Sequence, residues 1–119
     1  MNIPSSAVRM DINDMRRRLG DDEALIAVLF RLFLEDYAAR LESIKSAVNG
    51  RRLDDLRREA HMMKGNASNL SAFGIVEAAA ALEDSADRGG GADVDHLFAT
   101  LVFEVEQLVT ELRGLLGGL

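Results

Sequence analysis

Apolar residues recur at intervals of three and four along most of the chain, which is the spacing of helices that bury one face. Residues 52–70 carry the clearest seam, made of Leu53, Leu56, Ala60, Met63, Ala67 and Leu70. Residues 93–116 carry a second seam, made of Val94, Leu97, Leu101, Val105, Leu108, Leu112 and Leu115. Both segments therefore predict long helices that pack in a bundle.

Further helices complete the predicted pattern. Residues 22–48 carry a stripe at helical spacing, made of Ile26, Phe30, Phe33, Tyr37, Leu41, Ile44 and Val48. The apolar face is wider in the first half of this segment, where it also includes Leu25, Val28, Leu29, Leu32 and Leu34. We therefore expect this face to touch more than one neighbouring helix. Residues 72–87 predict a helix with Ser71 as its N-cap, and residues 11–19 predict a short leading helix.

Glycines stand where these periodic segments stop, at Gly20, Gly50 and the run 89–91. The short connections imply that consecutive helices are antiparallel neighbours. The predicted fold is all-α, an antiparallel up-down four-helix bundle with a short additional N-terminal helix. We expect a single domain over residues 1–119, with a flexible N-terminal segment over 1–10 and a C-terminal tail over 117–119.

Composition narrows the function classes. The chain has 119 residues and no cysteine, so disulfides and thiolate metal sites are excluded, and a reducing compartment, the cytoplasm, is expected. No apolar run approaches the ~18 residues of a membrane span, so we expect no membrane contact. The net charge of −6 disfavours nucleic-acid binding. Because the seams suffice to close the bundle, a monomer is expected.

His61 lies on the face of its predicted helix that points away from the apolar seam, so it is not expected in the core. At 100° per residue, its side chain points roughly 130° away from the seam centre, toward solvent. Lys64 and Gly65 follow one turn later on the same face, and Arg57 and Ser68 flank them. The other histidine, His96, is predicted to be a solvated surface residue without a functional role.

These neighbours suit the chemistry of a phosphoryl carrier. An exposed imidazole is largely neutral at pH 7 and is a competent nucleophile. Lys64 would offset the charge of a phosphoryl group, while Arg57 and Arg58 would attract an acidic pocket. An interior glycine costs ~1 kcal/mol relative to alanine, which is explained if another molecule approaches the helix closely at Gly65.

The segment 60–70, A-H-M-M-K-G-N-A-S-N-L, resembles the signature of histidine-containing phosphotransfer (HPt) domains, A-H-x-L-K-G-[SA]-[SA]-x-x-[LIV]. L-F-L-E-D over 32–36 and A-A-A-A-L-E over 78–83 resemble the family's second and fourth helices. The resemblance implies that His61 is phosphorylated on Nε2, that Lys64 supports the phosphoryl group and that Gly65 lets a receiver domain dock. Met63 and Asn66 depart from the pattern, and Asn66 is expected to alter partner preference.

The resemblance further implies a carrier that takes a phosphoryl group from a phospho-aspartyl receiver domain or a hybrid sensor kinase. It would pass the group to a response-regulator receiver aspartate. Neither G-x-x-x-x-G-K-[ST] nor G-x-G-x-x-G occurs, so we expect no ATP site and no enzyme activity of its own. No cofactor or metal site is expected, and Mg²⁺ would be supplied by the receiver. The docking residues would be Arg57, Arg58, Gly65 and Ser68.

Two alternatives remain open. The first is a non-catalytic four-helix-bundle module that binds and regulates a signalling kinase or receiver, which loss of the histidine or lysine would have favoured. The second is a metal site or small hydrolase in the bundle. A carboxylate-bridged dimetal bundle needs two E-x-x-H motifs, whereas D-x-x-H at 93–96 is the nearest match.

Overall fold

The structure is a computed structural model that describes residue 3 and residues 7–117. Its helices follow in the order α1 (Ile12–Leu19), α2 (Glu23–Asn49), α3 (Leu53–Asn69), α4 (Phe73–Asp87) and α5 (Val94–Leu115). No strand occurs in the part of the chain that the structure describes. The all-α prediction is therefore confirmed, and every helix begins and ends within one residue of its expected bounds.

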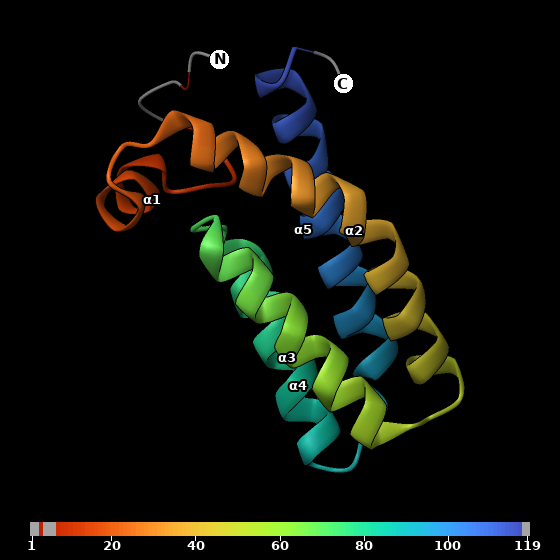
Figure 1. Cartoon of the computed structure of the whole chain (residues 1–119). Coiled ribbons are helices and arrows are strands. Elements are labelled where there is room, and N and C mark those ends of the chain that lie inside the picture. Colours follow the sequence, from red (N-terminus) through yellow and green to blue (C-terminus); the bar gives the residue numbers. More distant parts are fainter. Residues whose placement is uncertain (1–2, 4–6, 118–119) are drawn as a thin grey trace.

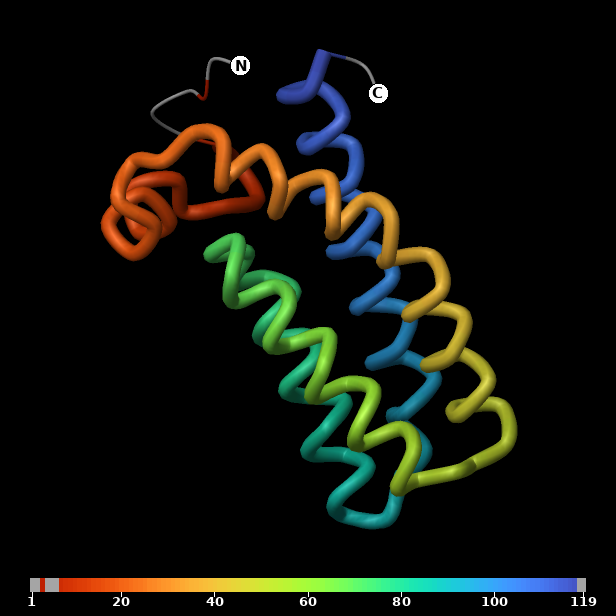
Figure 2. The backbone as a smooth tube through the Cα atoms, viewed as in Figure 1, coloured from red at the N-terminus to blue at the C-terminus, as the bar shows by residue number. Residues whose placement is uncertain are grey.

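The long helices form a closed ring. α2 contacts α3 and α5, and α4 contacts the same two helices. Successive helices from α2 to α5 run alternately down and up (Figure 1), and the backbone trace shows the short turns that join them (Figure 2). The molecule measures 43 × 25 × 19 Å, with α1 beside the start of α2 at one end.

The predicted seams make the core. On α3 the fully buried residues are Leu56, Ala60, Met63 and Ala67, and on α5 they are Val94, Leu101, Val105, Leu108 and Leu112. This arrangement commits one face of α3 to the core and leaves the opposite face, with His61, for solvent. Removal of apolar side chains from water is the dominant force that holds such a bundle together.

The helix starts differ in how they are capped. The Asp11 carboxylate accepts a hydrogen bond from the Asp14 amide, and Asp22 does the same for Leu25, so both are N-caps. Ser71 was expected to cap α4, and that prediction is wrong. The residue before α4 is Ala72, while Ser71 is fully buried at a φ of 52°.

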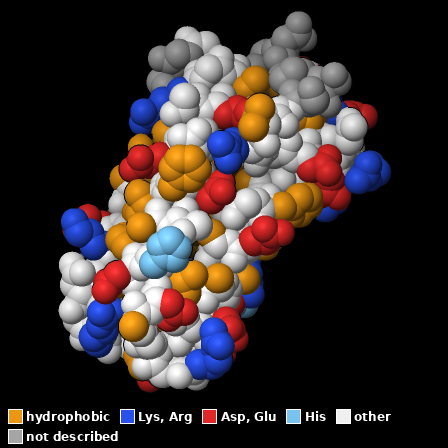
Figure 3. Space-filling model, turned by 180° about the vertical axis from the view of Figure 1, so that it is seen from behind, with side chains coloured by type: hydrophobic (Ala, Val, Ile, Leu, Met, Phe, Trp, Pro, Cys, Tyr) orange, Lys and Arg blue, Asp and Glu red, His pale blue; other side chains and the backbone are white. Residues whose placement is uncertain are grey.

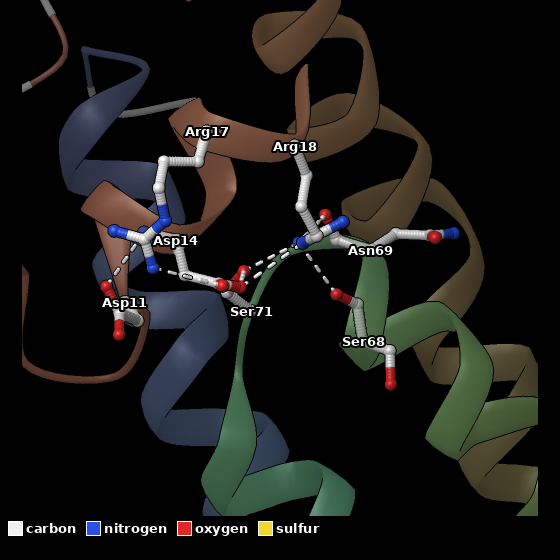
Figure 4. Close-up of polar contacts among 7 residues, drawn as sticks. All are labelled: Asp11, Asp14, Arg17, Arg18, Ser68, Asn69 and Ser71. Carbon is white, nitrogen blue, oxygen red and sulfur yellow. Dashed lines mark hydrogen bonds and ion pairs between the residues drawn. The ribbon is translucent and has the colours of Figure 1, made fainter. Parts of the chain in front are cut away.

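A tertiary network takes the Ser71 side chain away from the capping position. Its hydroxyl donates to Oδ2 of Asp14 at 2.6 Å and accepts from Arg18 at 2.6 Å. The Arg18 guanidinium also donates to the backbone carbonyls of Ser68 and Asn69 (Figure 4). Together these contacts fasten α1 to the turn between α3 and α4.

The helix with the widened apolar face, α2, contacts both α3 and α5, so the expectation of more than one neighbour is confirmed, but part of the face stays exposed. Leu25, Val28 and Leu32 are 40%, 47% and 53% exposed, whereas Leu29 and Leu34 pack at the edge of the core. The short helix leaves these leucine and valine side chains exposed, while its Arg18 is bound at the α3–α4 turn. An apolar strip therefore stays on the surface of the first half of α2.

The N-terminal segment was expected to be flexible over residues 1–10. Within this segment, the Glu111 carboxylate accepts hydrogen bonds of 2.9 Å from the backbone amides of Val8 and Arg9, although the Val8 side chain is 85% exposed. Met10 and Ile3 join the core. Residues 1–2 and 4–6 lie outside the described residues, as do 118–119 of the expected C-terminal tail.

Candidate functional site

His61 lies in the middle of α3 with its side chain 65% exposed, so the predicted outward orientation is confirmed. Its Nδ1 is 2.9 Å from Oε2 of Glu83, which lies on α4. Nε2 has no hydrogen-bond partner among the described residues. The ring is therefore held through Nδ1, while most of the side chain is open to solvent.

One carboxylate serves two groups at this site. Lys64 lies one turn beyond His61, and its Nζ donates to Oε1 of Glu83 at 2.6 Å. The Lys64 ammonium, and to a lesser degree the His61 hydrogen bond, hold the pKa of Glu83 below its ordinary value, although partial burial opposes them. Glu83 is consequently a carboxylate at neutral pH and can only accept hydrogen bonds.

This arrangement selects one tautomer of the imidazole. A carboxylate at Nδ1 requires a proton on that nitrogen, so the neutral ring has its lone pair on Nε2. Nε2, the nitrogen that Glu83 does not bind, is then the nucleophilic one. A second partner that orients an imidazole in this way is a recurring feature of reactive histidines.

Glu83 is the site residue that the sequence does not reveal. In the sequence it only closes the run A-A-A-A-L-E, and its role depends on how α4 is rotated against α3. The neighbouring Leu82 is fully buried, and the step of one residue brings Glu83 to the edge of the bundle beside α3. No motif spacing within a single helix contains this information.

The remaining predicted residues surround His61 on α3. A Cβ atom added to Gly65 would meet nothing within 4 Å, so the surface there is open. Ser68 is exposed, and Figure 4 shows its hydroxyl pointing away from the Arg18 guanidinium that its carbonyl binds. Both residues therefore leave the surface next to His61 accessible to another molecule.

The two arginines of the predicted basic surface are exposed but paired within the chain. Arg57 Nε is 3.6 Å from Asp87, and Arg58 donates to Asp55 at 2.8 Å. Arg58, followed by Arg52, holds the pKa of Asp55 below its ordinary value. Attraction of an acidic partner by Arg57 and Arg58 is consequently weaker than the sequence alone indicates.

Other candidate sites gain little support. His96 is exposed in the first turn of α5, as expected of a surface residue. Within residues 7–117 and residue 3, no histidine, cysteine, aspartate or glutamate side chains cluster in a way that could hold a metal ion.

In the same part of the chain, no helix is long and apolar enough to span a membrane. Acidic and basic side chains interleave on the face seen in Figure 3.

A histidine turned outward from a four-helix bundle, with a lysine one turn later, defines a class of phosphocarrier proteins. The family model described as "Hpt domain" matches residues 28–115, a segment that contains His61, Lys64 and Glu83. The chain belongs to this family of histidine-containing phosphotransfer domains. Its general role is therefore histidine phosphotransfer in two-component signalling, as a phosphocarrier that works with receiver and kinase partners.

A solved structure supports the same assignment. The chain is similar to histidine-containing phosphotransfer protein B (HptB) from Pseudomonas aeruginosa PAO1, with 27% sequence identity and a TM-score of 0.83. The match covers 92% of this chain and 95% of that chain. No protein with a curated description matches the chain.

Proposed function

We propose that His61 accepts a phosphoryl group from a phospho-aspartyl receiver domain or a hybrid sensor kinase and passes it to a response-regulator aspartate. One observation carries the proposal: the ring is 65% exposed while Glu83 binds its Nδ1 at 2.9 Å. The nitrogen available to a partner is then the one with the lone pair. The direction of net flow depends on the partners.

The proposed step is an in-line displacement at phosphorus. The Nε2 lone pair of His61 forms the N–P bond as the acyl phosphate P–O bond of the donor breaks, and the donor aspartate leaves as a carboxylate. The imidazole becomes a cation that keeps its Nδ1 proton. Glu83 stabilises that cation because its carboxylate already accepts this hydrogen bond. The reverse displacement regenerates the neutral ring.

Lys64 has a role once the phosphoryl group arrives. Its ammonium is 30% exposed and pairs with Glu83 at 2.6 Å, so it lies near the ring without being buried beneath it. A phosphoryl group on Nε2 would compete with Glu83 for this cation. Lys64 would thus stabilise the phosphorylated state, and Mg²⁺ for the transfer would come from the receiver.

The docking partner would approach over Gly65 and Ser68, with Arg57 and Arg58 at the margin of the contact. We propose that the domain acts as a monomer, since each of α2 to α5 already contacts two neighbouring helices. Because neither glycine-rich nucleotide motif occurs in the sequence, we propose that the domain has no ATP site of its own. The absence of cysteine fits a reducing compartment, so we place the relay in the cytoplasm.

Transfer from a phosphorylated receiver domain tests the proposal, with the wild type compared with His61→Gln. An acid-labile, alkali-stable label on the wild type alone is the expected result. Circular dichroism first confirms that the wild type is folded. If several phosphorylated receivers then leave it unlabelled, the proposal is contradicted. The bundle would then be a non-catalytic module that binds a signalling kinase or receiver.

A further inference from the structure

One methionine side chain lies on the surface beside the proposed phosphorylation site. Met62 follows His61 in α3 and is 39% exposed. Met10, Met15 and Met63 are all buried. Among the described residues, the thioether of Met62 is therefore the one that a dissolved reagent reaches most readily.

The sulfur of Met62 has a polar neighbour on the adjacent helix. Nη1 of Arg40, on α2, lies 3.9 Å from Sδ of Met62, close enough for a weak N–H···S hydrogen bond. The same guanidinium is paired with Asp36 through its Nε. Asp36 thus holds Arg40 where its second nitrogen can donate to the sulfur.

An exposed thioether is open to oxidation by peroxides. A lone pair of the Met62 sulfur attacks one oxygen of hydrogen peroxide, the O–O bond breaks as the S–O bond forms, and the other oxygen leaves as water after a proton shift. The sulfur loses two electrons, which the peroxide gains. The product is methionine sulfoxide, a polar group that methionine sulfoxide reductases return to the thioether.

Arg40 is placed to bind the oxidised side chain. The sulfoxide oxygen is a polar acceptor, whereas the thioether accepts hydrogen bonds only weakly. An N–H group that already lies 3.9 Å from the sulfur can donate to an oxygen attached to it. Oxidation at this exposed position therefore changes the surface of the domain and leaves its core intact.

That surface belongs to the region that a partner of His61 must cover. Met62 and Gly65 are three positions apart on α3, which makes them neighbours on the helix surface. A partner that approaches closely over Gly65 therefore meets the Met62 side chain. A flexible, apolar thioether adapts to such a contact, whereas a sulfoxide brings a polar atom that the partner has to match.

We infer that Met62 is an oxidation site, and that its conversion to the sulfoxide by a peroxide weakens the exchange of phosphoryl groups between His61 and a receiver domain. The inference rests on the proposed function, because exchange requires a receiver to approach His61. It gives the domain a chemical input that is independent of any kinase, since an oxidant slows the exchange until a reductase restores the thioether.

Peptide mass spectrometry after graded doses of hydrogen peroxide tests the site. Met62 is expected to become oxidised at a several-fold lower dose than Met63, because Met63 is buried. Fragmentation of the peptide that contains both residues separates them, and Met1, which lies outside the described residues, is followed in its own peptide. Equal oxidation of Met62 and Met63 in the folded protein overturns the inference.

Receiver affinity before and after peroxide treatment tests the consequence. The receiver is one that exchanges phosphoryl groups with the untreated wild type. Oxidation of Met62 is expected to raise the dissociation constant by roughly fivefold or more, as a polar atom enters an apolar contact, and sulfoxide reductases should restore it.

Met62→Leu is the matched control, because it lacks this thioether and keeps the other methionines. Its dissociation constant, whatever the starting value, should be the same before and after the peroxide dose that oxidises Met62 in the wild type. An unchanged affinity in the oxidised wild type, or an equal loss in treated Met62→Leu, overturns the inference.

Phosphorylation by phosphoramidate separates this inference from the proposed function. The small donor needs no docking, so oxidised and untreated wild type should be labelled on His61 at equal rates, and slower labelling after oxidation overturns the inference. If the untreated wild type exchanges with the receiver but oxidation changes nothing, only the Met62 site is contradicted. If no receiver exchanges with the untreated wild type, the proposed function fails and the inference falls with it.

Discussion

At the scale of single residues, the account depends on the two hydrogen bonds that the carboxylate oxygens of Glu83 accept. Oε2 binds the imidazole of His61 and Oε1 binds the ammonium of Lys64. The carboxylate therefore fixes the ring and holds in place the cation that a phosphoryl group would attract. Substitution of Glu83 removes both contacts, whereas substitution of Lys64 removes only the second, so the two variants together separate the two roles.

Glu83→Ala removes the partner of Nδ1. We expect phosphoryl transfer to slow by roughly 10-fold to 100-fold, by analogy with metal-ligating histidines that lose the partner of their second ring nitrogen. Glu83→Gln keeps a hydrogen-bond acceptor and should recover part of the rate. Nitrogen-15 NMR of the ring should show a mixture of tautomers in Glu83→Ala, and a ring still protonated only at Nδ1 would contradict the assigned role.

Lys64→Ala removes the cation beside the ring. Transfer is expected to slow by roughly 10-fold or more because the developing phosphoryl charge loses a donor, while the fold is kept since Lys64 lies off the core seam. Lys45→Ala on the exposed side of α2 is the matched control and should transfer normally. Equal transfer kinetics in both variants would remove Lys64 from the mechanism.

Gly65→Gln separates stability from docking. The open space around Gly65 accommodates a side chain, so the substitution should raise the free energy of unfolding by about 0.5–1 kcal/mol while blocking the receiver. Gly114→Gln is the control, because Gly114 also lies in a helix with nothing within 4 Å of an added Cβ. A normal receiver affinity for Gly65→Gln would refute the close approach.

The sequence was sufficient to predict the positions of the residues that share one helix face with His61. Their positions follow from 100° per residue, so Lys64 and Gly65 could be placed beside the ring before the structure was known. Glu83 could not, because its contact depends on the packing of α4 against α3. The pairing of Arg57 with Asp87 depends on the same packing and was missed for the same reason.

At the scale of elements, α1 is held by polar contacts as well as by its buried Ile12 and Met15. Arg18 satisfies the carbonyl groups of Ser68 and Asn69 at the end of α3. These carbonyls belong to the last turn of the helix, where no amide of the same helix is available to them. The short helix thus completes the end of α3, two turns beyond His61.

Ser71→Ala tests this attachment. Loss of the hydroxyl leaves both Asp14 and Arg18 without one partner in a half-buried setting, and we expect a loss of about 1–2 kcal/mol in the free energy of unfolding. Ser43→Ala on the exposed surface of α2 should have little effect. Equal stability of the two variants in urea denaturation would mean that the network contributes nothing.

Helix boundaries were predictable because glycines and capping aspartates mark them locally. Gly20 adopts a left-handed conformation after α1, and Asp22 caps the next helix, as their residue types indicate. Ser71 also has the residue type of a cap, but tertiary hydrogen bonds compete for its hydroxyl. The exposure of Leu25 and Val28 was equally unpredictable, since it depends on how the helices pack against one another.

At the scale of the whole molecule, carboxylates with lowered pKa values link stability to pH. Ser71 and then Arg18 lower the pKa of Asp14, and Lys64 lowers that of Glu83. Because these pKa values are lower in the folded state, the groups stabilise the fold above their ordinary values of 3.8 and 4.5. That contribution is lost as the pH falls through the folded-state values.

The melting temperature should therefore hold steady from neutral pH to the ordinary carboxyl range and then fall. Asp14→Asn should be less stable than the wild type at neutral pH, and the two curves should converge at low pH, where Asp14 of the wild type is protonated. Thermal unfolding followed by circular dichroism across this range provides the comparison. A constant difference between the two proteins at every pH would contradict the linkage.

The central claim is that Nε2 of His61 carries the phosphoryl group while Nδ1 stays bound to Glu83. Phosphorus–nitrogen correlation NMR of the phosphorylated, nitrogen-15-labelled protein tests both parts at once. We predict one phosphorus signal coupled to Nε2 of His61, with a proton retained on Nδ1. A phosphoryl group on Nδ1, on His96 or on a carboxylate would contradict the account.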